Sequence, residues 1–115
     1  MSTKLEVSDL QGGVRILKLT GQLDITGVAA LETKFYAHCG GDKMKVQVDL
    51  GAVAFLSSLG IRMLLQALKA VNARGGQLQF QNPQPAVTST LEISGLGQLI
   101  VRGGDDIVAG QLTRE

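Results

Sequence analysis

The stretch from Val48 to Leu65 constrains the fold of this chain more than any other part of it. It begins as a buried strand, passes through a short connection, and reaches two serines, Ser57 and Ser58, at the start of an amphipathic helix. The first turn of a helix has backbone N–H groups without intrahelical partners and the positive end of the helix dipole, and both favour an anion. A phosphate on a hydroxyl here would be tolerated by the fold and accessible to a partner.

The helix after the serines has the strongest apolar stripe in the chain. Its apolar residues recur at the spacing i, i+3, i+4, i+7 and i+10, which is typical of one helix face. We therefore expect its leucines to be buried against neighbouring strands, and Leu65→Ala to cost roughly 2–5 kcal/mol. These leucines are Leu64, Leu65 and Leu68, and the strand residues that they should meet are Val46, Val48 and Leu78.

The remaining pattern predicts a small α/β domain. Apolar alternation, helical spacing and Gly or Pro breaks give the order β-β-α-β-α-β-α-β, with Thr20–Asp24 predicted to interrupt the pattern after the second strand. We expect an α/β fold with two layers, in which helices cover one face of a small mixed sheet of four to five strands. The predicted strands are 5–10, 14–19, 45–50, 77–81 and 99–101, and the predicted helices around the serine helix are 26–39, 86–93 and a short closing one at 105–112.

Composition excludes several classes of function. The length of 115 residues fits one domain spanning 1–115, and 44% hydrophobic with 18% charged residues argues against disorder. A net charge of +1 without a basic stripe argues against nucleic acid as a partner. His38 and Cys39 are the only histidine and cysteine, so we expect no disulfide, no metal site and no cofactor. Without a long apolar run we expect no membrane segment, and we expect a cytoplasmic protein.

Three separated segments, in the right order, resemble the STAS domain of bacterial anti-sigma factor antagonists. Thr20–Asp24 is similar to the family's T-G-E-L-D turn, and Phe55–Ile61 to its F-[hydrophobic]-D-[ST]-[ST]-G-[hydrophobic] motif. Pro85–Val87, followed by Leu91–Leu96, resembles the P-x-V…L-x-x-[ST]-G-L pattern before the last strand. The resemblance extends from about Leu5 to Val101.

The resemblance implies a binding switch and no enzymatic activity. An unphosphorylated antagonist binds an anti-sigma factor that is also a serine kinase of the histidine-kinase-like ATPase type, and this frees the sigma factor. The kinase phosphorylates the antagonist and the complex dissociates, until a serine phosphatase restores binding. By position, Ser58 matches the phosphoacceptor. The implied docking face joins the start of the Ser58 helix to the turn at 21–24; its residues are Gly21, Asp24, Ser57, Ser58, Leu59, Gly60 and Arg62.

The motif also differs from the family at two places, and this leaves alternatives open. Ser57 stands where the motif has an acidic residue, and Leu59 where it has a hydroxyl. The first difference favours an alternative function, a phosphorylation-independent STAS scaffold or transporter-associated subunit. A third possible function is that of a small nucleotide-binding or hydrolytic protein. The sequence lacks a phosphate loop and a base near the serines, and both absences argue against this function.

Each docking residue also has a purely structural interpretation. Ser57 is expected to cap the helix, whereas Ser58 is expected to be the acceptor. Gly60 either permits close approach of another backbone or relieves packing against the sheet. Asp24 either accepts from a turn amide or belongs to the docking face, and Arg62 is expected to be solvated.

Overall fold

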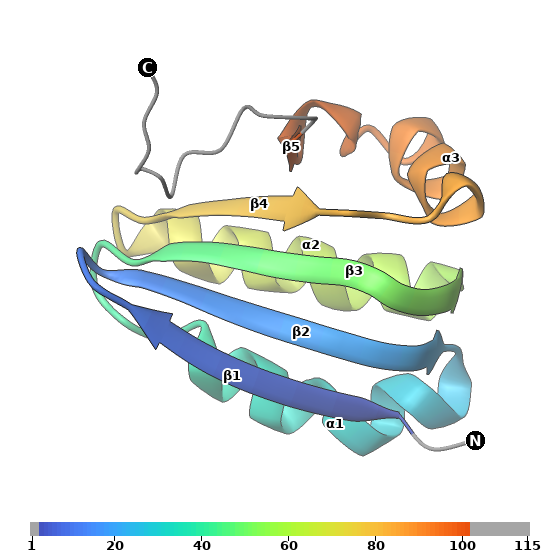
Figure 1. Cartoon of the computed structure of the whole chain (residues 1–115), viewed down its shortest axis with the longest axis horizontal. Coiled ribbons are helices and arrows are strands. Elements are labelled where there is room, and N and C mark those ends of the chain that lie inside the picture. Colours follow the sequence, from blue (N-terminus) through green and yellow to red (C-terminus); the bar gives the residue numbers. More distant parts are fainter. Residues whose placement is uncertain (1–2, 102–115) are drawn as a thin grey trace.

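The computed structural model describes residues 3–101. A five-stranded sheet forms one layer and two long helices form the other (Figure 1). The strands are β1 (Lys4–Leu10), β2 (Val14–Leu23), β3 (Lys45–Leu56), β4 (Gln77–Gln81) and β5 (Ile100–Val101); the helices are α1 (Ile25–His38), α2 (Ser58–Ala73) and α3 (Pro85–Ile93), and a 3-10 turn, η1 (Gly97–Leu99), precedes β5.

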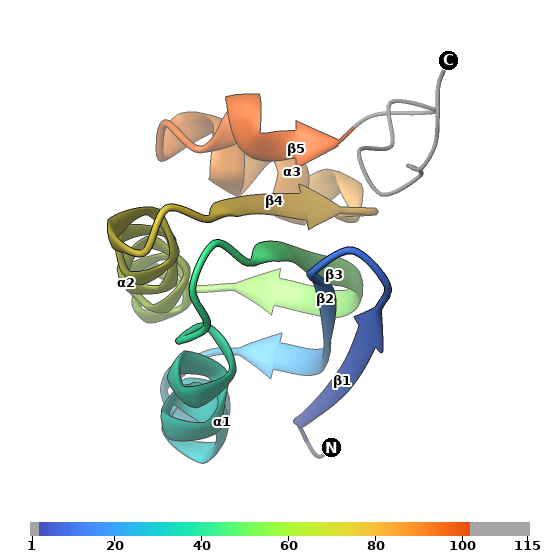
Figure 2. The same cartoon turned by 90° about the vertical axis from the view of Figure 1, so that its left-hand side faces the viewer.

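The sheet is mixed and its strands follow one another in chain order. β1 pairs with β2 in an antiparallel hairpin, and β2 to β5 are parallel neighbours. Helices α1 and α2 lie side by side on one face of the sheet (Figure 2). Helix α3 lies beyond the end of β4 and contacts β3 and η1. The predicted fold class and element order are confirmed, while the predicted helix at 105–112 lies outside the described residues.

The core is almost wholly aliphatic and lies between the sheet and the two long helices. Leu64 is fully buried, as are the strand residues that it was expected to meet, and Leu68 is half-buried against the same cluster. The prediction for Leu65 is wrong, because this side chain is 37% exposed. Successive residues on a helix point about 100° apart, and the face of α2 that is turned to the sheet centres on Met63, Leu64 and Ala67.

Two strands run further than the sequence pattern predicts. Thr20–Leu23 does not interrupt β2 but continues it, and β3 does not end at Leu50 but continues to Leu56. The two extensions pair with each other, with register shifts between Lys18 and Thr20 and between Gly21 and Gln22. An irregular register removes the simple alternation from the sequence while the strands stay paired. This added length carries both helix starts to the same place.

Candidate functional site

The two segments that resemble STAS motifs meet at one end of the sheet. β2 leads into α1 through Asp24 and β3 leads into α2 through Ser57, and these parallel strands end side by side (Figure 1). The backbone N–H of Ser57 donates to the carbonyl of Leu23 over 3.0 Å. The expectation that the serine pair lies beside residues 21–24 is therefore confirmed, although Gly21 to Leu23 are the end of β2 rather than a turn.

The two neighbouring serines have different surroundings. The Ser57 hydroxyl donates to the Leu23 carbonyl over 2.6 Å and accepts from the Gly60 N–H over 3.2 Å, so it caps α2 as expected. Ser58 begins α2, is exposed, and its hydroxyl makes no hydrogen bond with any group in residues 3–101. Of these two hydroxyls, that of Ser58 is thus the one available to an incoming group.

Asp24 caps the other helix. Its Oδ1 accepts from the Gly27 N–H over 2.9 Å at the start of α1, so the interpretation as a turn-amide partner is confirmed. Gly27, which the sequence reading did not single out, is needed here because a Cβ on it would overlap the carbonyl oxygen of Gln22. The spacing Asp-x-x-Gly at a helix start was the available signal.

Gly60 lies where the start of α2 comes close to the end of β2. A Cβ on Gly60 would lie 2.9 Å from the carbonyl oxygen of Leu23 and 2.6 Å from the side chain of Leu56. Close approach of another backbone therefore explains this glycine, with packing against Leu56 adding to it. Gly21 is buried and has φ of 109°, a conformation that glycine adopts far more readily than other residues.

Exposed apolar side chains lie at the same end of the sheet as Ser58. Ile25 is 72% exposed and Phe55 50% exposed, and the sequence pattern predicted neither. A groove of about 680 Å³ runs between α1 and α2, with Leu59 and the exposed Arg62 among its lining residues. Tyr36 also lines it, and burial, together with the charge of Glu32, raises the pKa of this phenol. The site and the adjoining groove thus offer an uncharged hydroxyl, apolar contact area, the cation of Arg62 and the carboxylate of Glu32.

Other kinds of site find little support within residues 3–101. No three side chains of His, Cys, Asp or Glu gather there as metal ligands would. Cys39 is buried, and burial raises the pKa of its thiol to about 11, which disfavours the reactive thiolate. None of the described helices is long and apolar enough to cross a bilayer.

Comparison with known proteins defines the class to which this fold and site belong. Residues 7–102 match the family described as "Mlab, STAS domain", and the chain belongs to the STAS domain family. It is 30% identical over 83 residues to BtrV of Bordetella bronchiseptica, to which the role of anti-sigma factor antagonist is ascribed; the match covers 72% of each chain. It is 26% identical over 83 residues to the anti-sigma F factor antagonist of Lysinibacillus sphaericus, covering 71% of each.

Solved structures with the same fold include anti-sigma factor antagonists and part of an anion transporter. The unphosphorylated form of the anti-sigma factor antagonist SpoIIAA matches with a TM-score of 0.77 and 18% identity, covering 94% of this chain and 96% of that one. A Bacillus SpoIIAA structure in the phosphorylated form matches with a TM-score of 0.72. The murine anion transporter Slc26a9 also matches with a TM-score of 0.72 and 18% identity, covering 96% of this chain but 22% of the transporter.

Proposed function

We propose that this protein is a cytoplasmic anti-sigma factor antagonist that phosphorylation at Ser58 switches off. Its partner is an anti-sigma factor that is also a serine kinase of the histidine-kinase-like ATPase type, and a serine phosphatase reverses the modification. The observation that carries the proposal is the contrast between the serines: Ser57 is committed to two hydrogen bonds, whereas the Ser58 hydroxyl is exposed and unpartnered within the described residues.

The geometry supports this switch for physical reasons. A phosphate adds about −1.5 to −2 charge at neutral pH, and at the start of α2 the helix dipole favours that charge within the fold. The same charge placed in an interface against apolar Ile25 and Phe55 would lose water that these side chains cannot replace. Phosphorylation should therefore leave the fold intact while it breaks the complex. Docking residues in this proposal are Gly21, Asp24, Ser57, Ser58, Leu59, Gly60 and Arg62.

Calorimetric titration of Ser58 variants against an anti-sigma factor tests the proposal. The anti-sigma F factor of Lysinibacillus sphaericus is one available probe, because an antagonist from that organism is a relative. Ser58→Asp should weaken binding tenfold or more, whereas Ser58→Ala should bind like the wild type but take up no phosphate from kinase and ATP. Ser8→Asp adds the same charge at an exposed serine on β1 and serves as the control. Phosphate that mass spectrometry maps to another residue would contradict the assignment.

A second function is favoured by the sequence at position 57. Ser57 lacks the charge of the acidic motif residue, and the fold is also that of part of an anion transporter. A phosphorylation-independent scaffold or transporter-associated subunit would take up no phosphate at Ser58, and its affinity for its partner would be the same with Ser58 or with Ser58→Asp. In the titration with the anti-sigma factor, such a protein would either not bind or bind equally well with both residues.

A further inference from the structure

The Ser57 hydroxyl touches both turns of the site at once. It donates to the Leu23 carbonyl over 2.6 Å, across 34 positions of sequence, and accepts from the Gly60 N–H over 3.2 Å. The Leu23 carbonyl also accepts from the Ser57 backbone N–H over 3.0 Å. One residue thus fastens the end of β2 to the start of α2 by its main chain and by its side chain.

This double role requires a group that both accepts and donates. A hydroxyl has a proton for the Leu23 carbonyl and lone pairs for the Gly60 N–H. An ionised carboxylate, which the STAS motif that this sequence resembles has at the position of Ser57, can accept from the helix N–H but has no proton to give. It would place a negative oxygen against the oxygen of Leu23.

The effect of these hydrogen bonds extends beyond α2 to the start of α1. Leu23 is followed by Asp24, whose carboxylate accepts from the Gly27 N–H and caps α1. Gly60 allows the Leu23 carbonyl to come close on one side, and Gly27 allows the Gln22 carbonyl to come close on the other. With little free space around the turn, a displacement of the Leu23 carbonyl has to be shared by the first turn of α1.

We propose that Ser57 is a positioning residue whose hydroxyl links the two turns, so that the docking surface around Ser58 is formed before a partner arrives. The link belongs to the free protein; only the identity of what docks rests on the proposed function. The partner then meets an ordered surface in which residue 57 carries no charge, and its complementary surface has no need of a cation opposite that residue.

Amide hydrogen exchange of the free protein tests the link without any partner. We expect Ser57→Ala to speed exchange at both Gly60 and Gly27 by about fivefold, the ratio that a net hydrogen bond of about 1 kcal/mol gives. Ser57→Asp should keep Gly60 protected, because aspartate caps helices well, yet should speed exchange at Gly27. Ser57→Thr, which retains the hydroxyl, and Ser57→Asn, which has the shape of aspartate without its charge and retains a donor, should restore protection at Gly27.

A purely local role predicts a different pattern. If Ser57 only caps α2, Ser57→Ala changes Gly60 alone, and exchange at Gly27 stays at the wild-type rate in every variant. That result would overturn the proposal. Faster exchange at Gly27 in Ser57→Thr and Ser57→Asn, to the extent seen in Ser57→Ala, would overturn it as well, because the donor would then have no effect.

Binding completes the test. Titration with the anti-sigma F factor of Lysinibacillus sphaericus should give equal affinities for the wild type, Ser57→Thr and Ser57→Asn, and about fivefold weaker binding for Ser57→Ala and Ser57→Asp. Stronger binding of Ser57→Asp would mean that the partner recognises a carboxylate at position 57, which contradicts the docking part of the proposal. If the wild type does not bind, both the proposed function and the docking part fail for this probe, whereas the exchange at Gly27 still decides whether the link exists.

Discussion

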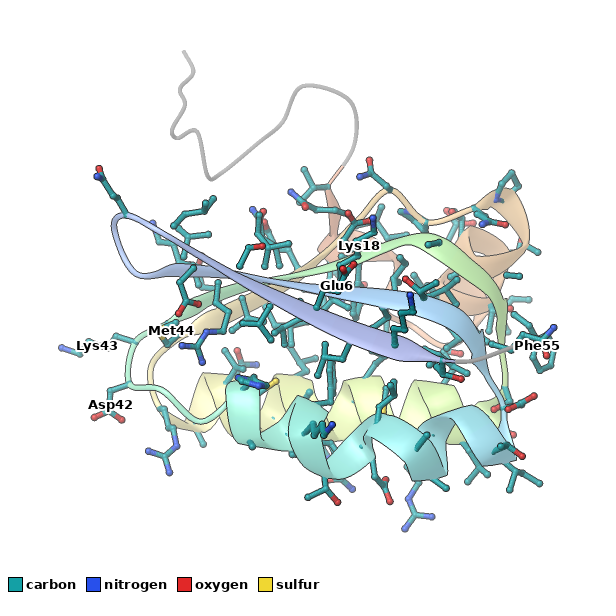
Figure 3. The ribbon with its side chains drawn as sticks, turned by 60° about the horizontal axis from the view of Figure 1, so that its bottom comes forward. Glu6, Lys18, Asp42, Lys43, Met44 and Phe55 are labelled. Atoms are coloured by element: carbon teal, nitrogen blue, oxygen red, sulfur yellow. The ribbon has the colours of Figure 1, made fainter. Side chains whose placement is uncertain are left out.

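The two ends of the sheet are built in different ways. At the end where the helices begin, Asp24 and Ser57 cap the first turns with side-chain oxygens, and the neighbouring Ser58, Ile25 and Phe55 are exposed. Figure 3 shows Phe55 at this end and Asp42, Lys43 and Met44 at the other.

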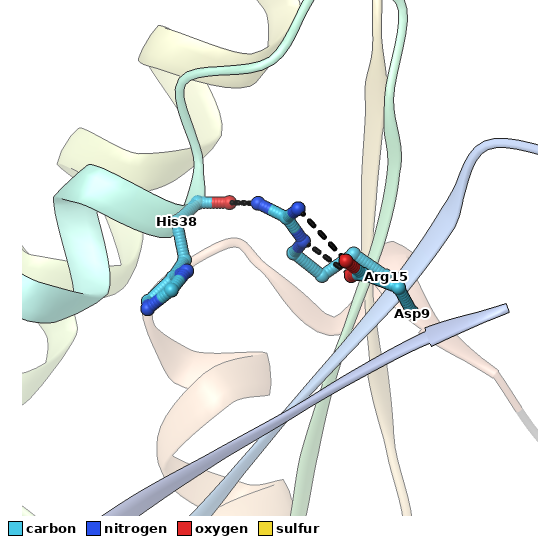
Figure 4. A network of polar contacts seen from close by, with 3 residues as sticks. All are labelled: Asp9, Arg15 and His38. Carbon is cyan, nitrogen blue, oxygen red and sulfur yellow. Dashed lines mark hydrogen bonds and ion pairs between the residues drawn. The ribbon is translucent and has the colours of Figure 1, made fainter.

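At the opposite end of the sheet, charged side chains form ion pairs and hydrogen bonds that connect separate segments of the chain. Arg15 donates to both oxygens of Asp9, over 2.6 and 3.1 Å, and to the carbonyl of His38 at the end of α1 over 3.1 Å (Figure 4). Arg74, just after α2, pairs with Asp42 over 3.2 Å. These contacts satisfy the polar groups around the helix ends, and positive charge there suits the helix dipole.

The two ends of the sheet therefore differ in role. One end holds chain segments together, and the other also presents a surface to another molecule. At the charge-paired end, Arg15 and Arg74 find their partners within the chain. The Ser58 end is held by close backbone approach at glycines, and this leaves its hydroxyl and apolar side chains free for another molecule. The following predictions test that separation, beginning with the largest expected effect.

Gly27→Ala should damage the Ser58 end most severely. Its new Cβ would overlap the Gln22 carbonyl oxygen, and because that atom belongs to a paired strand it cannot move away easily. We expect a loss of more than about 4 kcal/mol in the free energy of unfolding, measured by urea denaturation. Gly40→Ala, just beyond the other end of α1, meets only an ordinary contact of 3.6 Å and should cost within about 0.5 kcal/mol. Equal losses would remove the contrast between the ends.

Leu64→Ala tests the core that joins the two ends. Leu64 is fully buried, so its truncation should cost roughly 2–5 kcal/mol, whereas Leu65→Ala, at a 37% exposed side chain, should cost less than about 1 kcal/mol. Urea midpoints of the two variants give the comparison on neighbouring leucines of one helix. A larger loss at Leu65 would contradict the orientation of α2.

The sequence was sufficient for the element order and for most of the core, because periodicity reports which face of an element is buried. It misplaced Leu65 because an apolar residue on the border of a helix stripe satisfies the spacing whether or not the sheet covers it. It also ended β2 and β3 early, since the register shifts around Gly21 hide the alternation on which strand prediction depends. Those extra residues are the ones that bring the two turns together.

For the site, the sequence identified the serines and their neighbouring turn, and the capping role of Ser57, but not the link between them. The bond from Ser57 to Leu23 spans 34 positions and no local pattern encodes it. Gly27 and the exposed Ile25 and Phe55 were missed for a related reason. A small residue or an apolar one has the same letter whether it packs inside the fold or lies on its surface.

Phe55→Ser tests whether the partner binds at the Ser58 end of the sheet and not at the opposite end. Phe55 is 50% exposed near Ser58, and Leu10 is 42% exposed at the hairpin end of β1, so the two offer a matched pair. We expect Phe55→Ser to weaken binding of the anti-sigma factor by about tenfold, which corresponds to about 1.4 kcal/mol, and Leu10→Ser to leave affinity unchanged. Both variants should unfold at nearly the wild-type urea concentration. Equal effects on affinity would place the docking surface elsewhere.

The smallest effect is expected at the charge-paired end and should appear only in acid. Hydrogen bonds from Arg15 lower the pKa of Asp9 below its ordinary value of 3.8. The lowered pKa means that the folded state favours the carboxylate, so this stabilisation is fully present above the ordinary pKa and is lost as pH falls through the lower, folded-state value. Asp9→Asn should therefore be slightly less stable than the wild type at pH 7, and the two should converge as the pH is lowered below about 4. Added salt should also shrink the difference, since the pair is exposed to solvent.

Urea midpoints of both proteins at pH 7 and pH 3 measure the change, with Asp42→Asn, at the more exposed pair, as the control. A difference that persists unchanged in acid would show that Asp9 acts through packing rather than charge, and an effect of Asp9→Asn on partner binding would show that the two ends are not independent.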